Sequence, residues 1–365
     1  MIDWGASDSA LADAKASAFL NLYCLNMSPA SPQLDVSLPK GLPGLGPLHD
    51  LATVCADVEA SQLAVNSFTA GARENFAVLT GLVPERARPG FAAVYAFCRV
   101  ADDLADEHDG SDAARASALE NLGRCELLTR RAFAQTTEPL PPLFVALRAA
   151  AGSYGLGVDP FLDLLEAFRQ DQTVTRYRSL DGLIRYSEKS ANPVGRIVLQ
   201  LLAPESLSGS SGRNVLAASD ALCTGLQLVN FWQDVRRDLL DRDRVYLPTE
   251  TGITDRMLRS WTSETSASAT ARNQEAFERA MRPLCGAVAE LFGRAQVLPE
   301  LLPVDARPPI RLFLAGGEGT LRAVEECGYR TLWMRPTITR LTKVGLLCSA
   351  YLRAWTDPDL RAHHL

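Results

Sequence analysis

Oxygen-bearing side chains recur every four residues within Gln227–Pro248, at Asn230, Asp234 and Asp238. On an α-helix this spacing places all three side chains along one face. The segment upstream is largely apolar, and a buried carboxylate without a partner is too costly to keep ionised. Mg²⁺ is one candidate partner because it prefers oxygen ligands. The alternative is a solvated face on which nearby arginines pair with the acids: Arg236, Arg237 and Arg244.

A second acidic stretch ends the helix expected at 86–107, where Asp102 and Asp106 lie one turn apart with Asp103 beside them. Like charges at this spacing destabilise a bare helix, and the negative end of the helix dipole adds to the cost. A compensating cation or a fully solvated helix end is therefore expected. Two such stretches suggest two helices that face each other across a bundle cavity and hold a Mg²⁺ cluster. That arrangement suits metal-assisted loss of diphosphate, with phosphate contacts from Arg99 and Arg335.

The elements that must position these residues are predicted to be helices almost throughout. Five prolines between residues 29 and 47 mark 1–60 as a partly irregular N-terminal extension. We expect one all-α domain at 61–355 and a C-terminal tail at 356–365. Helical periodicity predicts segments at 60–82, 86–107, 112–136, 141–153, 159–172, 180–203, 212–242, 254–263, 268–296, 303–326 and 338–355. Gly316–Gly319 is interpreted as a small-residue helix crossing, because no lysine followed by Ser or Thr completes a phosphate loop.

Composition narrows the function classes. The chain has 365 residues and a formal net charge of −6, which gives no general electrostatic case for nucleic-acid binding. The 8 cysteines form no Cys-x-x-Cys pair, which is typical of a reducing cytoplasm and argues against a zinc site. A cytoplasmic protein is expected. The apolar segment 341–355 is compatible with a peripheral membrane contact, and a terminal packing helix is the alternative.

Taken together, the two acidic motifs resemble those of the head-to-head prenyl synthases, which include squalene, dehydrosqualene and phytoene synthases. The resemblance covers about residues 62–350 and implies a single-domain isoprenoid-synthase bundle around a central cavity, with two or three Mg²⁺ ions and a prenyl diphosphate substrate. It implies a metal set of Asp102, Asp106, Asn230, Asp234 and Asp238, with Asp103 near it. Phosphate-binding positions fall on Arg99 and Arg335. The positions that line the cavity in the family fall on Gln170, Asp171, Gln172, Tyr186 and Gln227, and those that resemble its wall on Tyr95 and Phe76.

Finer signatures are most similar to the bacterial hydroxysqualene synthase branch. They include Glu74-Asn75-Phe76, Ser190 to Gly195 with Asn192 and Pro193, and Asn230 to Asp234. This branch is understood to ionise presqualene diphosphate and let water capture the rearranged cation, without NADPH. Gln233 stands where two-step synthases usually carry arginine, and Gly317 replaces a tyrosine that touches diphosphate. The resemblance therefore favours hydroxysqualene formation. Pro193 is expected to kink a helix and turn backbone carbonyls toward the cavity.

Other functions stay open on sequence grounds. Within the enzyme class they are presqualene diphosphate synthase, squalene synthase acting on two farnesyl diphosphates, and phytoene synthase. A squalene synthase needs NADPH, and no dinucleotide site is evident. A non-catalytic helical scaffold is the alternative of another class, although it would have no reason to keep two acidic motifs with their arginines. Downstream enzymes of the same pathway are further conceivable partners.

Overall fold

The structure is a computed structural model that describes residues 47–71, 81–106, 111–134, 136–263 and 271–336. Asn75, Phe76 and the helix expected at 338–355 lie outside the described residues. Within these ranges the protein is built from helices, and the only β-type pairings are isolated bridges at Cys55–Leu140 and Arg176–Val245. The all-α prediction is confirmed.

Most helices among the described residues lie within or close to the predicted segments. The α6 helix begins where it was expected, because the Ser111 side chain accepts a hydrogen bond from the backbone N–H of Ala114. The long helices are α3 (Val58–Gly71), α5 (Arg88–Asp106), α6 (Asp112–Phe133), α7 (Pro142–Tyr154), α8 (Asp159–Gln170), α9 (Leu180–Ser190), α10 (Asn192–Leu202), α11 (Gly209–Gln233), α12 (Val235–Asp241), α13 (Asp255–Thr262), α14 (Ala271–Ala295) and α15 (Arg307–Glu326).

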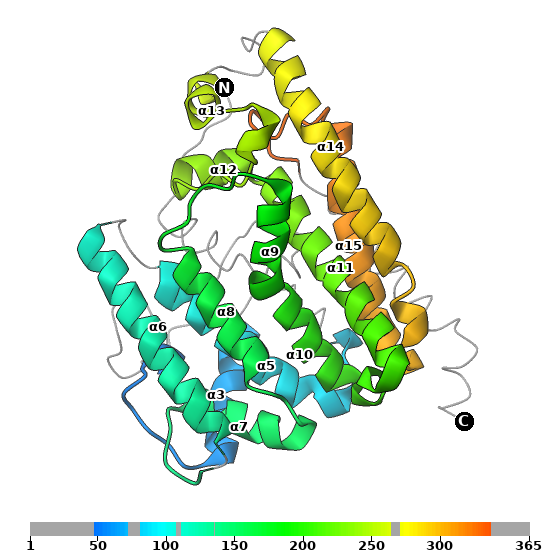
Figure 1. Cartoon of the computed structure of the whole chain (residues 1–365). Helices are drawn as coiled ribbons and strands as arrows, with labels where there is room; N and C mark the ends of the chain where they lie inside the picture. Colours follow the sequence, from blue (N-terminus) through cyan, green and yellow to red (C-terminus); the bar gives the residue numbers. More distant parts are fainter. Residues whose placement is uncertain (1–46, 72–80, 107–110, 135, 264–270, 337–365) are drawn as a thin grey trace.

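Helix α11 is the central element of the bundle. It packs against α14 and α15 on one side and against α9 and α10 on the other (Figure 1). Its apolar positions are buried almost all round, including the fully buried Trp232. A helix that is apolar on every side can be stable only inside a bundle. The other group of packed helices is formed by α3, α5 and α7, and α5 also contacts α6 and α8.

Two predicted helices are each interrupted in the structure. The segment expected at 180–203 breaks at Ala191, so Pro193 lies in the first turn of α10 and does not kink a helix interior. A proline is well tolerated there because its missing N–H would have no intrahelical partner. The expected kink at Pro193 is therefore wrong. The segment expected at 212–242 breaks at Asp234, whose φ of −103° and ψ of 16° are not helical.

The break at Asp234 leaves the backbone hydrogen bonds of the second acidic stretch in place. The backbone N–H of Asp234 still donates to the carbonyl of Asn230 at 2.9 Å, and that of Asp238 donates to Asp234 at 2.9 Å. Both bonds join residues four apart, as in an uninterrupted helix. The chain therefore passes from α11 to α12 while the backbone bonds between Asn230, Asp234 and Asp238 remain.

Part of the predicted N-terminal extension packs on the bundle. Leu48, His49 and Leu51 are buried, and the backbones of Cys55 and Leu140 exchange two hydrogen bonds of 2.7 and 3.1 Å. Arg124 of α6 also donates to the carbonyl of Leu51 at 3.1 Å. Residues 47–57 therefore form a strap, which we call the N-terminal strap, that is fixed to α6 and to the loop before α7.

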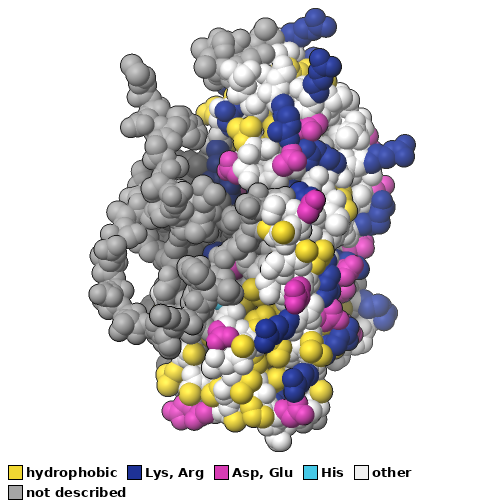
Figure 2. All heavy atoms as spheres, turned by 90° about the vertical axis from the view of Figure 1, so that its left-hand side faces the viewer, with side chains coloured by type: hydrophobic (Ala, Val, Ile, Leu, Met, Phe, Trp, Pro, Cys, Tyr) yellow, Lys and Arg dark blue, Asp and Glu magenta, His cyan; other side chains and the backbone are white. Residues whose placement is uncertain are grey.

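The surface mixes both signs of charge. On the face shown in Figure 2, basic and acidic side chains are interspersed, and hydrophobic side chains gather toward the end of the molecule where α3 and α7 lie. No helix among the described residues has the length and apolar character needed to cross a membrane.

Candidate active site

The first acidic stretch carries a carboxylate that is held from two sides. The guanidinium of Arg99 contacts both oxygens of Asp103: Nε donates a hydrogen bond of 3.0 Å to Oδ2, and Nη2 forms an ion-pair contact of 2.9 Å with Oδ1. The Nε2 atom of His49 lies 2.9 Å from Asp103 Oδ2, and both residues are buried. An arginine that grips a carboxylate through two N–H groups is fixed in orientation as well as in distance. Asp103 therefore anchors Arg99.

Asp102 lies beside this anchor and is also buried, with 7% of its surface exposed. The sequence analysis placed Asp102 and Asp106 on one face of the helix, and both lie in the last two turns of α5. The structure describes Asp106 only as the last residue of that helix, and its side chain lies outside the described set. Asp102 and Asp103 are therefore the described acids of this stretch.

Asp234 of the second stretch is held by two arginines. Arg335 donates to its two oxygens, from Nε at 2.5 Å and from Nη2 at 3.1 Å, and Arg237 donates at 3.1 Å. Arg335 approaches from a segment 101 residues further along the chain. The predicted phosphate-binding arginine and the predicted metal-binding acid therefore lie in direct contact.

Gln233 fixes the segment that carries Arg335. Its Nε2 donates a hydrogen bond of 2.8 Å to the carbonyl of Pro336, and both residues are buried. An amide is suited to this contact because it can donate to a backbone carbonyl without bringing a charge into the interior. The Gln233 amide group is thus engaged with the backbone of the segment that carries Arg335.

Asp238 is a buried acid whose protonation responds strongly to its surroundings. Burial, followed by the neighbouring charge of Asp234, raises the pKa of Asp238 to about 7, against the opposing effect of three arginines: Arg242, Arg237 and Arg244. Burial also lowers the pKa of Arg237. Two buried carboxylates one turn apart cannot both ionise cheaply, and a cation between them would relieve the repulsion.

Asn230 completes the second stretch at the C-terminal end of α11. Its Nδ2 atom is buried and has no hydrogen-bond partner among the described residues. A buried polar atom without a partner carries a desolvation cost, which a bound ligand or water could remove. Because Nδ2 is an N–H donor, the partner it calls for is a hydrogen-bond acceptor such as a water or ligand oxygen.

Residues after α8 connect the two acidic stretches. Gln172 donates to the carbonyl of Ala105 in α5 at 3.0 Å. Its neighbour Asp171 accepts a hydrogen bond from the Tyr186 hydroxyl at 2.9 Å and lies 3.7 Å from the Nη1 atom of Arg244. The backbone N–H of Arg244 donates in turn to the carbonyl of Asp238. The predicted residues Gln172, Asp171 and Tyr186 thus lie in a chain of contacts from one stretch to the other.

Three aromatic rings, those of Tyr177, Phe231 and Tyr246, surround Tyr186 at one end of this chain of contacts. Phe231 and Tyr246 stack with centroids 3.7 Å apart, and the rings of Tyr177 and Tyr186 lie 5.5 Å apart. Burial raises the pKa of Tyr186 well above its usual value, with the Asp171 charge as a second cause. The Tyr186 hydroxyl therefore keeps its proton and acts as a donor throughout the ordinary pH range.

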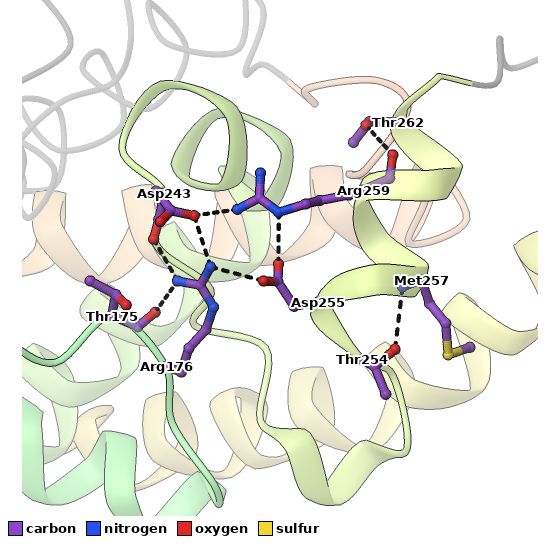
Figure 3. A network of polar contacts seen from close by, with 8 residues as sticks. All are labelled: Thr175, Arg176, Asp243, Thr254, Asp255, Met257, Arg259 and Thr262. Atoms are coloured by element: carbon purple, nitrogen blue, oxygen red, sulfur yellow. Dashed lines mark hydrogen bonds and ion pairs between the residues drawn. The ribbon is translucent and has the colours of Figure 1, made fainter. Parts of the chain in front are cut away.

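A charged network holds the loop that carries Arg244 and Tyr246 (Figure 3). Arg176 contacts the carboxylates of Asp243 at 2.8 Å and Asp255 at 3.1 Å, and Arg259 contacts both acids from the other side. Next to it, the backbone N–H of Val245 donates to the carbonyl of Thr175 at 2.9 Å. The network therefore joins the segment after α8 to the segment after α12 and to α13.

Three further predicted residues, Gln227, Tyr95 and Asn192, are buried in the bundle. Gln227 of α11 and Tyr95 of α5 are 5% and 3% exposed. Asn192 begins α10, and its Oδ1 accepts a hydrogen bond from Thr224 of α11 at 3.0 Å. Asn192 therefore helps to fix the break between α9 and α10 against the central helix.

Two residues that sequence reasoning did not place in the site are His49 and Arg244. Arg244 was considered only as a surface partner of the acids, yet it is 8% exposed and joins Asp171 to the Asp238 region. Arg236 was also expected to pair with the acids, but its guanidinium donates to the carbonyls of Thr262 and Leu332. The one available signal for His49 was that only two of the four histidines lie away from the C-terminus.

The donor set suits a hard divalent cation in its chemistry. It offers carboxylate oxygens and the amide oxygen of Asn230, and a carboxylate pair whose repulsion a cation would relieve. Within the described part of the chain, no three acidic, histidine or cysteine side chains converge closely enough to form a metal site by themselves. Asp103 and Asp234 are instead paired with His49 and arginines.

Residues 69–342 match the squalene/phytoene synthase family. This stretch is well over half of the chain, and the chain therefore belongs to this family. The resemblance to head-to-head prenyl synthases is confirmed. The reaction within the family is a separate question.

Several relatives bear on that question. A hydroxysqualene synthase of Zymomonas mobilis is 37% identical over 179 residues, which are 48% of this chain and 55% of that protein. A hydroxysqualene synthase of Rhodopseudomonas palustris is 38% identical over 177 residues, with 48% and 56% covered. The matched part thus spans about half the length of these curated relatives.

A solved structure adds a longer match. Squalene synthase HpnC from Alicyclobacillus acidocaldarius is 32% identical, with a TM-score of 0.64 over 76% of this chain and 97% of that one. A dehydrosqualene synthase in complex with a ligand has a TM-score of 0.66 at 23% identity, and supports the fold alone.

Proposed function

We propose that this protein converts presqualene diphosphate to hydroxysqualene and releases diphosphate. The observation that carries the proposal is the contact chain through Gln172, Asp171 and Arg244, which joins two buried acidic stretches in a member of a prenyl synthase family. The similarity to two hydroxysqualene synthases supports this branch of the family.

The two acidic stretches would bind the diphosphate group through Mg²⁺. Asp102, Asp106, Asn230, Asp234 and Asp238 would hold the metal, and Asp103 would serve as the anchor of Arg99. Bound Mg²⁺ would supply Lewis-acid stabilisation of the departing diphosphate. Arg99 and Arg335, already oriented by carboxylates, would contribute charge-assisted hydrogen bonds to the same group.

Tyr186 of α9 and the aromatic rings around it would orient the reacting carbon skeleton. Tyr186 holds its proton on the hydroxyl and donates it to Asp171 in a hydrogen bond of 2.9 Å. The adjoining aromatic faces of Tyr177, Tyr246 and Phe231 carry negative charge density that can stabilise a developing cation. Burial of these rings also limits where water can reach that cation.

Gln233 supports the half-reaction that handles one diphosphate. The side chain donates to Pro336, so the position that carries arginine in two-step synthases provides no cation to a phosphate here. A first condensation must hold two prenyl diphosphates, whereas ionisation of presqualene diphosphate involves one. Fewer basic contacts are compatible with the second reaction.

The test is incubation of the purified protein with Mg²⁺ and either farnesyl diphosphate or presqualene diphosphate, with and without NADPH. We expect hydroxysqualene from presqualene diphosphate alone and no dependence on NADPH. Efficient consumption of farnesyl diphosphate would reject the proposal in favour of presqualene diphosphate, squalene or phytoene formation.

The metal set is tested by Asp102→Ala and Asp234→Ala. Each change should abolish turnover while far-UV circular dichroism stays that of a helical protein. Retained activity would remove that residue from the metal set. Mg²⁺ together with inorganic diphosphate should raise the melting temperature of the unaltered protein, because a ligand that binds only the folded state stabilises it. A scaffold protein would show no such shift.

A further inference from the structure

We propose that His49, on the N-terminal strap, is a positioning residue of the diphosphate site. It would act through Asp103, whose carboxylate orients the Arg99 guanidinium. This inference rests on the proposed function, since it needs a diphosphate for Arg99 to bind.

Asp103 is the meeting point of this arrangement. Its Oδ2 lies 2.9 Å from His49 Nε2 and 3.0 Å from Arg99 Nε, while Oδ1 lies 2.9 Å from Arg99 Nη2. With Nε2–H as donor, His49 and Arg99 together give the carboxylate two hydrogen bonds, and the Nη2 atom of Arg99 adds an ion-pair contact. A carboxylate bound on two sides cannot rotate about its side-chain torsion without breaking one of them, so the position of Arg99 is fixed too.

His49 is packed in the interior of the bundle and not on its surface. The residue is 4% exposed, and its ring meets that of Phe68 in α3 edge-on at 5.8 Å. A buried imidazole carries a desolvation cost that a charged hydrogen-bond partner offsets. The His49–Asp103 contact supplies that partner across 54 residues of sequence.

The N-terminal strap holds His49 at this depth. Leu48 and Leu51 flank the histidine and are 1% and 7% exposed. Beyond them, the Leu51 carbonyl accepts from Arg124, and Cys55 pairs with Leu140. Buried leucines therefore hold the strap on both sides of His49. Hydrogen bonds at Leu51 and Cys55 hold it further on the C-terminal side.

The strap lies before the part of the chain that matches the family, which begins at residue 69. The site thus receives a side chain from a segment that the family match does not include. A chain shortened to the matched part would lose the hydrogen bond between His49 and Asp103, so Asp103 would keep its contacts with Arg99 alone.

The test compares three full-length proteins: the unaltered chain, His49→Phe and His49→Gln. Phenylalanine keeps a ring against Phe68 but has no N–H, whereas glutamine keeps an N–H donor at similar reach. Isothermal titration calorimetry would measure the affinity for inorganic diphosphate in the presence of Mg²⁺. We expect His49→Phe to weaken binding by about tenfold, because a hydrogen bond to a charged group contributes on that scale. His49→Gln should recover most of the loss.

A double-mutant cycle with Asp103→Asn separates positioning from packing. If His49 acts through the Asp103 carboxylate, His49→Phe has little further effect on binding once Asp103 is asparagine. Equal binding by the unaltered chain and by His49→Phe would overturn the inference and leave the proposed function standing. A similar loss in His49→Gln would also overturn it, since packing alone would then explain the effect. An unaltered chain that fails to bind Mg²⁺ with diphosphate would overturn the proposed function and this inference together.

Discussion

Arg335 and Asp234 form a two-pronged ion pair, with Nε donating to Oδ1 and Nη2 to Oδ2. Asp234 is 5% exposed on its side chain and Arg335 is 33% exposed. The arginine therefore neutralises a buried acid while keeping part of its own surface outside the core. A diphosphate that binds here would compete for, or share, the same guanidinium.

Replacing Arg335 by lysine should be costly although the charge is kept. Lysine offers a point charge and cannot make the parallel pair of hydrogen bonds to Asp234. We expect turnover of presqualene diphosphate to fall by at least about tenfold, which corresponds to about 1.4 kcal/mol of lost stabilisation. Steady-state kinetics would measure it, with Arg282→Lys as a matched control because Arg282 pairs with Glu278 on the surface. A lysine variant as active as the control would contradict a directional role for Arg335.

The raised pKa of Asp238 predicts a pH dependence of stability. The folded protein holds a proton at Asp238 up to a pKa of about 7, whereas an unfolded aspartate releases it near its ordinary value of about 4. Between these values the folded state binds more protons, so the free energy of unfolding falls as pH rises through that window. Without Mg²⁺, urea unfolding at several pH values should show this decline.

The variant Asp238→Asn should flatten that decline, because an amide does not titrate. Mg²⁺ with inorganic diphosphate should act in the opposite direction on the unaltered protein, since it favours the ionised carboxylate. An unchanged slope in Asp238→Asn would assign the pH dependence to another group.

The sequence determined the helices well and the pairings between them poorly. Apolar periodicity and the Ser111 cap located α6 because both signals are local. The break at Asp234 has no glycine or proline to announce it, and it coincides with ion pairs to Arg237 and to Arg335, 101 residues away. Tertiary contacts of that range override local helix preference and leave no periodic trace.

For the candidate site too, the sequence predicted the local features and not the contacts between distant segments. Spacing in the sequence identified both acidic stretches, and family resemblance pointed to Tyr186 and Gln172. It could not show that Asp103 would be held by His49 or that Gln233 would donate to Pro336. These contacts depend on how distant segments cross in space, which spacing along one helix does not encode.

Arg176 offers a test of the loop that carries Arg244 and Tyr246. Arg176→Gln would remove contacts to Asp243 and Asp255, and Asp243 would also lose support for its left-handed backbone, with φ at 51°. We expect a loss of about 1 kcal/mol in the free energy of unfolding, since the network is partly exposed. The larger effect should be on turnover, because the loop holds Arg244 against Asp171. Arg176→Lys should restore part of the activity, and a turnover equal to that of the unaltered chain would show that the network does not position the site.

The small residues of α15 allow a direct test of packing around α11. A Cβ atom on Gly317 would lie 2.6 Å from Phe292 Cζ and 2.7 Å from Leu226 Cδ2, so the residue serves as the helix crossing that the sequence predicted. We expect Gly317→Ala to destabilise the protein by about 1–3 kcal/mol, which is the usual cost of overpacking a core. Gly293→Ala in α14 is the matched control, because a Cβ there meets nothing within 4 Å. The control should raise stability by up to about 1 kcal/mol through helix propensity alone. Thermal and urea unfolding would measure both, and equal shifts in the two variants would show that α15 can move away from α11 at no cost.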